Sequence, residues 1–489
     1  MMRRRRVFIR RVTCVAAMGV AAPLLAATAS SASPARPAGP PPGLRPAQVD
    51  VTNDTTYRYG EPEIAVNPGN PDNLVYVATK VGYTYPCQAA NPSPCQLVST
   101  VFGPQPGGLI NDVPGFSPNG IFVSFNRGRT WRSVTVPTFP PGKPLPDSDI
   151  GEAGDPTITA GSDGTFYFAE DAIDFANLPT TIVRDGAILV SKSTDGGRTW
   201  STPTLTGTAV DRPFLTTDLS TGQIYEASSG PPGPNSSGDP NAAPGTGFDR
   251  YLVESTDGVH WSSPEPFGGA GLGAFFSAAH GVLATAITST SPAVCGGVAP
   301  VSCVVFQTTT DAGASWSRHV LPGSADNSDS PLVAADPRRP GHFTVAFLNA
   351  AGTEFQVFQT RDSGNTWSSQ PAIVTDDPAQ KHWHPWLAYS PEGVVGLMWQ
   401  NNPPGTGQPY GVFAAISYDG GTHFSLPLQV GSSPAPQPGE FGNSGDDFSF
   451  INIHGDDVFV AWAGWQPVER QGFLTTVKLQ AFRFGHGRP

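Results

Sequence analysis

The 489-residue sequence predicts an all-β fold, a β-propeller of seven four-stranded blades. The first observation is a short signature that occurs six times, of which residues 193–200 (STDGGRTW) form the fullest copy. Successive copies begin 69, 62, 54, 51 and 57 residues apart, a spacing typical of four-stranded blades. The second observation is composition, since 56 glycines and 52 prolines with no long helical periodicity suit many short strands joined by turns.

Each copy of the signature has the chemistry of a hairpin turn. An apolar run precedes it, as in Ile188-Leu189-Val190, and its glycine adopts backbone angles that other residues resist. The Asp carboxylate can accept backbone N–H bonds within the turn, and the closing Trp can pack on the next blade. We therefore predict a structural role, between strands three and four of a blade, for residues 124–131 (with Asn in place of Asp), 193–200, 255–261, 309–316, 360–367 and 417–424.

Candidate first and second strands lie upstream of every copy, and one more pair follows the last copy. These seven pairs are 63–66 with 74–78, 157–160 with 165–169, 214–217 with 223–227, 274–279 with 282–287, 332–335 with 342–347, 386–389 with 394–399, and 448–453 with 458–462. The seventh is followed by one strand, 475–484, so the otherwise unassigned residues 47–51 are expected to complete that blade and to close the ring. Six blades with a terminal hairpin are the alternative.

The N-terminal residues indicate export rather than fold. Residues 1–32 combine four arginines at positions 3–6, an apolar stretch at 12–27 and small-residue cleavage sites after Ala29 or Ala32, as an export signal does. The stretch is too short, and too interrupted by Pro23, for a membrane span. Arg5-Arg6 also resembles the twin-arginine pattern, so Sec and twin-arginine export both stay open. Residues 33–46 are predicted to be a disordered Pro-rich linker, and residues 47–486 a single propeller domain.

Charge and cysteines restrict the partners and the compartment. The formal charge of 28 − 40 = −12 becomes 22 − 40 = −18 once the six arginines of the signal are removed, which excludes nucleic acid and anionic membranes as good partners. In an oxidising compartment the spacing predicts the disulfides Cys87–Cys95 and Cys295–Cys303. No Cys or His spacing suggests zinc. We expect a secreted monomer that requires no cofactor.

A charged or ionisable residue precedes the innermost strand of nearly every blade, commonly beside a proline. Because inner strands converge on the propeller axis, on the face opposite the repeated turns, these side chains are expected to line one funnel. The predicted catalytic residues are Glu61, Asp155, Asp211, Arg212, His384 and Asp447. Three interpretations stay open: turn chemistry, a carboxyl pair for acid–base or nucleophilic catalysis, and a calcium site in which Asp446 and Asp447 are possible ligands.

Four further residues are predicted to bind substrate. Trp383 and Tyr410 suit stacking on sugar rings near the funnel, and Arg250 and Arg470 lie beside the long loops of the same face. Glu170 and Asp171, at the same end of the second blade, can join either a catalytic or a calcium arrangement.

The repeated turns, known as Asp-boxes, together with the signal peptide and the ring of blades, make the chain similar to the sialidase superfamily from about residue 61 to residue 424. The resemblance implies the fold and a carbohydrate-active protein, although propellers of this kind also include other glycoside hydrolases, polysaccharide lyases and binding proteins. Sialidases carry an Arg-aliphatic-Pro motif in the first blade, where this chain has Glu61-Pro62. The nearest match, Arg212-Pro213, lacks the aliphatic residue.

The resemblance therefore leads us to expect a sialidase-like glycoside hydrolase that acts on extracellular glycans. A non-catalytic propeller that binds glycans or proteins is the alternative. A polysaccharide lyase with His384 or Tyr410 as its base is the third possibility.

Overall fold

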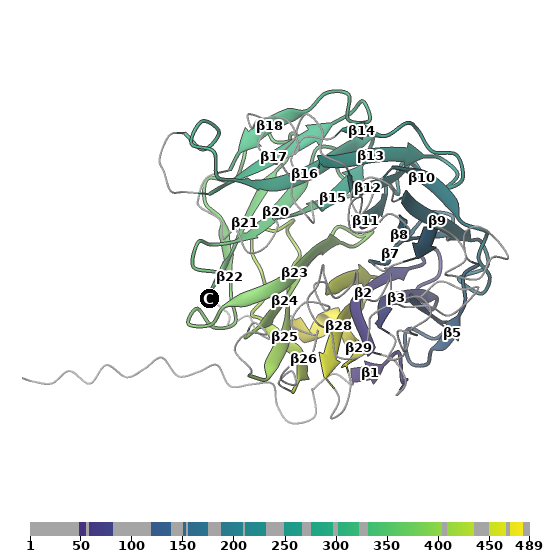
Figure 1. The fold of residues 1–489 in the computed structure, drawn as a ribbon. Helices are drawn as coiled ribbons and strands as arrows, with labels where there is room; N and C mark the ends of the chain where they lie inside the picture. The colour runs from purple at the N-terminus through teal and green to yellow at the C-terminus, as the bar shows by residue number, and fades with distance from the viewer. Residues whose placement is uncertain are drawn as a thin grey trace, which may run out of the picture. The chain divides into compact units, whose positions relative to one another are not determined.

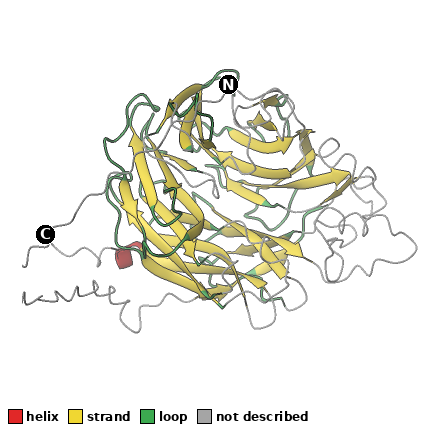
Figure 2. Ribbon diagram, turned by 60° about the vertical axis from the view of Figure 1, so that its left-hand side comes forward, coloured by secondary structure: helices red, strands yellow, loops and turns green. Residues whose placement is uncertain are grey.

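The described residues of the computed structural model form seven antiparallel sheets arranged as the blades of a propeller (Figure 1). The structure describes residues 48–54, 58–81, 119–137, 150–152, 155–174, 187–208, 211–230, 249–266, 275–296, 302–321, 331–402, 408–434, 449–465 and 470–482. Strands make up nearly all of the regular structure in this part of the chain, which contains a single short helical turn, η4 (Leu479–Phe482; Figure 2). The predicted fold class is confirmed.

The strands fall into four concentric sets. The inner strands of blades 1 to 7 are β2 (Arg58–Val66), β6 (Ile150–Glu152) with β7 (Thr157–Ala160), β11 (Asp211–Thr217), β15 (Phe276–Ala279), β19 (Leu332–Ala335), β23 (His382–Tyr389) and β27 (Phe450–His454). The second strands are β3 (Leu74–Val81), β8 (Phe166–Asp174), β12 (Ile224–Gly230), β16 (Val282–Ser289), β20 (Phe343–Leu348), β24 (Val395–Asn401) and β28 (Asp457–Trp465). The third strands are β4 (Gly120–Ser124), β9 (Ala187–Ser193), β13 (Asp249–Ser255), β17 (Cys303–Thr309), β21 (Phe355–Thr360), β25 (Tyr410–Ser417) and β29 (Arg470–Lys478). The outer strands are β5 (Arg132–Val134), β10 (Thr204–Thr208), β14 (Glu265–Pro266), β18 (Ser317–Val320), β22 (Ala372–Val374), β26 (Leu428–Ser433) and, for blade 7, β1 (Gln48–Asp50).

The N-terminal strand closes the ring. Each inner strand contacts the inner strand of the next blade, and β27 contacts β2. Strand β1 pairs with β29, with Gln48 opposite Thr475 and Asp50 opposite Phe473. The predicted closure is confirmed, but the predicted bounds of the last strand were wrong. Strand β29 begins at Arg470 rather than Thr475, because pairing along the whole of β28 sets its length, and the chain turns into η4 after Lys478.

The repeated turns join the third strand to the fourth in blades 1 to 6. In blade 2, Ser193 Oγ donates to Asp195 Oδ1 at 2.9 Å, and the N–H of Gly197 donates to Ser193 Oγ at 2.8 Å. Thr199 donates to both carboxylate oxygens of Asp195, from its N–H at 2.9 Å and from its hydroxyl at 2.7 Å. Burial acts to raise the pKa of Asp195, but these hydrogen bonds outweigh it and lower the pKa to about 2. The carboxylate therefore holds the hairpin.

Polar side chains of the inner strands connect neighbouring blades. Glu63 Oε2 accepts the N–H of Ile158 at 3.1 Å, and Thr157 Oγ1 accepts the N–H of Leu215 at 3.2 Å. Hydrogen bonds of this kind contribute about 0.5–1.5 kcal/mol each. They fix the relative height of blades 1, 2 and 3, which share apolar interfaces elsewhere.

Aromatic rings from four blades meet near the propeller axis. Trp386 of blade 6 lies 5.3 Å from Phe214 of blade 3, 4.8 Å from Phe275 of blade 4 and 3.9 Å from Phe450 of blade 7, measured between ring centroids. Phe276 lies 5.2 Å from Phe214. We call these five residues the aromatic plug, because their contacts span the axis.

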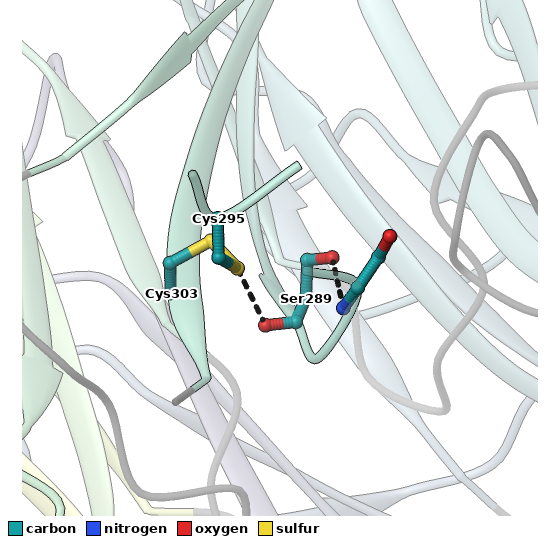
Figure 3. Close-up of a disulfide and its surroundings, with 4 residues drawn as sticks. Ser289, Cys295 and Cys303 are labelled. Atoms are coloured by element: carbon teal, nitrogen blue, oxygen red, sulfur yellow. Dashed lines mark hydrogen bonds between the residues drawn. A yellow bond between two sulfur atoms is a disulfide. The ribbon is translucent and has the colours of Figure 1, made fainter. Parts of the chain in front are cut away.

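One of the two predicted disulfides lies within the described residues. Cys295 and Cys303 are bonded, with their Cα atoms 5.6 Å apart, and Cys295 Sγ lies 3.2 Å from Ser289 O at the end of β16 (Figure 3). This pairing is confirmed. Cys87 and Cys95 lie outside the described residues. Among the described residues, no helix is long and apolar enough to cross a membrane.

Candidate functional site

Three inner strands carry the same two-residue β-bulge. In β2 the pairing passes from Gly60–Thr79 to Glu63–Val77, so two residues of the inner strand face one residue of its partner. The same shift occurs in β11 and in β23. The bulged pairs are Glu61-Pro62, Arg212-Pro213 and His384-Pro385. In blade 2, Asp155-Pro156 occupies the corresponding place, between β6 and β7.

The residue before each of these prolines has a left-handed backbone. The φ angles are 50° for Glu61, 47° for Asp155, 52° for Arg212 and 46° for His384. This conformation is unfavourable for residues with a Cβ, and a following proline normally enforces an extended backbone. Strain of this kind costs of the order of 1–3 kcal/mol per residue and occurs preferentially at functional sites. Four of the predicted catalytic residues thus occupy equivalent, strained positions at one end of the inner strands.

Asp155, Arg212 and His384 come together at this end of the propeller. The backbone N–H of Arg212 donates to Asp155 Oδ2 at 3.2 Å, which joins blade 2 to blade 3. His384 belongs to blade 6, and burial together with the positive charge of Arg212 lowers its pKa to about 3. The imidazole is therefore neutral at physiological pH. Its Nδ1 is inaccessible to solvent and has no hydrogen-bond partner among the described residues.

Glu61 occupies the equivalent position in blade 1. Its carboxylate is buried, and Oε2 accepts a hydrogen bond from the hydroxyl of Thr79 at 2.7 Å. Since blades 1 and 2 are neighbours, Glu61 and Asp155 present two carboxylates from adjacent inner strands.

The catalytic candidate Asp211, the substrate-binding candidate Arg470 and the possible metal ligands fall at or beyond the edge of the described structure. Asp211 is the first residue of β11, opposite Ser229, and Arg470 is the first residue of β29, opposite Trp465. Asp446 and Asp447 lie outside the described residues, so the calcium hypothesis stays a prediction. Within the described ranges, no three His, Cys, Asp or Glu side chains gather closely enough to hold a metal ion.

The two predicted stacking aromatics lie inside blade 6. The Trp383 ring lies 4.0 Å from the His384 ring, and its Nε1 donates to Asn401 O at 3.2 Å. The Tyr410 hydroxyl donates to Ala463 O at 2.7 Å. Both side chains are buried, so neither presents a ring face to solvent, and Trp383 packs between His384 and Tyr410.

Arg250 is buried in blade 3. It lies in β13, opposite Ser229, and its charge acts on Glu226. Burial raises the pKa of Glu226 to about 7, against hydrogen bonds from Ser228 and Thr206 and the attraction of Arg250. Asp211 and Arg250 both pair with Ser229, so Arg250 lies at the same end of blade 3 as Arg212, two strands further out.

Two buried carboxylates of the second strand of blade 2 lie opposite the gap between β6 and β7, where Asp155 is located. Glu170 and Asp171 are buried in β8, in the stretch that pairs with neither β6 nor β7. Asn119 Nδ2 of blade 1 donates to Glu170 Oε2 at 2.8 Å. Because neighbouring residues of a strand point to opposite faces, Asp171 faces blade 3, where the Asp155 carboxylate also reaches. The sequence signal was an acidic pair inside an apolar strand.

A cavity of about 200 Å³ lies along the axis, but it is separate from this site. Its lining begins at the aromatic plug and continues along the inner strands to their far ends, for example from Phe214 to Leu219 and from Phe450 to His454. None of the four bulge residues lines it. The plug therefore separates the bulge residues from the cavity.

Comparison with known proteins adds information about fold alone. No protein-family model and no curated protein matches the chain. Among solved structures, it is similar to the Hadza microbial sialidase Hz136, with 17% identity, coverage of 74% of this chain and 72% of that one, and a TM-score of 0.43. It is also similar to a protein of unknown function from Dyadobacter fermentans (14% identity, 89% and 99% coverage, TM-score 0.41). A third is the α-L-arabinanase of Penicillium chrysogenum (17% identity, 67% and 93% coverage, TM-score 0.40). At these identities and TM-scores, the similarities do not say what this chain acts on.

Proposed function

We propose that this protein is a secreted, sialidase-like glycoside hydrolase that acts on extracellular glycans with an anionic group near the cleaved bond. The observation that carries the proposal is the meeting of Asp155, Arg212 and His384 at strained bulge positions on three inner strands. Strain that is held at several equivalent positions, and that gathers charged side chains, is typical of a functional site rather than of a turn.

The chemistry of these groups suits acid–base cleavage of a glycosidic bond. Arg212 binds the anionic group of the sugar, since a guanidinium matches a carboxylate in geometry and charge. Asp155 and Glu61 are the two carboxyl groups that glycoside hydrolysis requires, one as acid and the other as base or nucleophile. The neutral His384 hydrogen-bonds to the substrate without adding a second positive charge. We assign the anion to Arg212 alone, because Arg250 is buried two strands further out in the same blade.

A panel of fluorogenic glycosides and uronic-acid polysaccharides tests the proposal. On a substrate that is turned over, we expect Arg212→Ala and Asp155→Asn to lower kcat/KM by about 10²–10⁴-fold, the usual contribution of a positioned catalytic group. Asp362→Asn, in the repeated turn of blade 5, is the matched control and should keep the wild-type rate. Binding of a glycan without turnover would favour the non-catalytic propeller instead.

One observation favours a polysaccharide lyase as the second candidate. A lyase needs a cation to neutralise the uronate and a neutral base to remove a proton, and Arg212 lies beside a neutral His384. The low pKa of His384 argues against this role, because general bases work best when their pKa lies near the working pH. A lyase would release an unsaturated uronate, which absorbs ultraviolet light, whereas a hydrolase would not.

Secretion is part of the proposal and rests on residues 1–32. We expect the protein collected from the culture medium to begin after Ala29 or Ala32, which N-terminal sequencing can measure.

A further inference from the structure

The carboxylate of Asp376 is the centre of a hydrogen-bond network beside the blade 6 bulge. Asp376 lies in the connection from β22 to β23, and its side chain is 9% exposed. Its Oδ1 accepts the indole N–H of Trp399 at 2.6 Å, and its Oδ2 accepts Asn401 Nδ2 at 3.0 Å. His382 Nε2 lies 3.4 Å from Oδ1.

These partners surround the bulge that carries His384. In the pairing of β23 with β24, His382 is opposite Asn401, and the register then shifts between Trp383 and Trp386. Trp399 is the single residue of β24 that faces the bulged pair His384-Pro385. Asp376 therefore binds Trp399, which is opposite the bulge, and Asn401. It also lies close to His382, which pairs with Asn401 two positions before the bulge.

A second route runs from Asp376 to the imidazole itself. Asn401 is held by Asp376 through its amide nitrogen, and its amide oxygen accepts the N–H of Gly411 at 2.7 Å. The backbone oxygen of Asn401 accepts Trp383 Nε1 at 3.2 Å, and the Trp383 ring packs against the ring of His384 at 4.0 Å. The position of His384 thus depends on Asn401 and Trp383, which Asp376 fixes.

The strained backbone explains why such support is needed. With φ at 46° before a proline, His384 would relax toward an extended backbone unless its surroundings prevented it. Relaxation would turn the imidazole away from Arg212, the charged group that acts on it from across the axis.

We propose that Asp376 is a positioning residue of the candidate site, which holds the blade 6 bulge so that the imidazole of His384 faces Arg212. The inference rests on the proposed function only in placing His384 in a working site, because the geometric dependence of His384 on Asp376 requires no substrate.

An NMR titration of protein with isotope-labelled histidine tests this dependence directly. The chain has nine histidines, and His384→Gln identifies the resonance of His384. In the wild type we expect His384 to stay neutral down to mildly acidic pH. In Asp376→Ala the bulge relaxes and the imidazole meets water, so its titration should move toward the ordinary value of 6.5. Asp376→Glu keeps both acceptor oxygens and should restore much of the wild-type titration.

The control variant is Asp419→Ala, in the repeated turn of the same blade on the opposite face. It should destabilise blade 6 without moving the His384 resonance. If Asp376→Ala does not fold, Asp376→Asn, which keeps the volume but loses one acceptor, carries the test.

An unchanged His384 titration in folded Asp376→Ala or Asp376→Asn would overturn the proposal, as would an equal change in Asp419→Ala. If a glycan substrate is found, Asp376→Asn should lower kcat/KM by roughly 100-fold, the effect of a small misplacement in an active site. If no glycan is turned over, the proposed function fails while the titration still decides the role of Asp376.

Discussion

The buried carboxyl group of Glu226 should make the stability of this propeller depend on pH. Glu226 lies in β12 with 2% of its surface exposed, and its Oε2 accepts a hydrogen bond from Thr206 of blade 2 at 3.2 Å. Burial raises its pKa from the ordinary value of 4.5 to about 7, and the opposing attraction of Arg250 is too weak to cancel this effect.

Proton binding decides whether the stability of the folded protein rises or falls with pH. Between pH 4.5 and about 7 the folded protein keeps the proton of Glu226 while the unfolded chain has lost it, so the folded state binds more protons. Its stability therefore falls as the pH rises through this window. A shift of about 2.5 pKa units corresponds to about 3 kcal/mol. The loss is absent below pH 4.5 and complete above about pH 7.

Unfolding of the wild type and of Glu226→Gln by denaturant, across a pH series, measures this effect. The variant cannot titrate at this position, so its stability relative to the wild type should rise by about 3 kcal/mol from pH 4.5 to about 7. Glu265→Gln, at the exposed outer strand of the same blade, is the matched control and should show no such change. A difference between wild type and Glu226→Gln that stays constant with pH would refute the reasoning.

Three further predictions concern the closure of the ring by β1, the disulfide, and the different roles of the two faces of the propeller. A protein that begins after Asp50 lacks β1 and should melt at a lower temperature, because β29 then has an unpaired edge; unchanged melting would contradict the closure. Replacing Cys295 and Cys303 with serine should cost about 2–3 kcal/mol, measured by chemical unfolding, and free thiols in the wild type would contradict the disulfide. Asp195→Ala should lower Tm and keep ligand binding while Arg212→Ala does the reverse, and the opposite outcome would place the site on the wrong face.

The fold could be predicted because its signals are local and repeated. Each repeated turn and its flanking strands lie within one stretch of chain, and β1 was identified because the last blade lacked an outer strand. The bounds of β29 could not be predicted, since Arg470, Gln471 and Gly472 have weak strand preference and are extended only by pairing with β28.

The candidate site was predictable only in part. A proline after Glu61, Asp155, Arg212 and His384 marked the positions, but not the left-handed backbone, which contradicts the usual preference before proline. Asp376 gave no signal at all. Its partner Trp399 is 23 residues away in sequence, and only the packed blade brings them together.

The aromatic plug has a consequence for how a polymer can be handled. Rings from blades 3, 4, 6 and 7 meet near the axis just beyond the bulge residues, so aromatic side chains occupy the axis there. A polymer is therefore not expected to pass through the propeller along its axis. A ligand that enters beside the bulge residues would leave on the same side. A glycan would therefore be engaged by one end, or by a bent stretch lying across the opening, and each bound product would have to depart before the next end could enter.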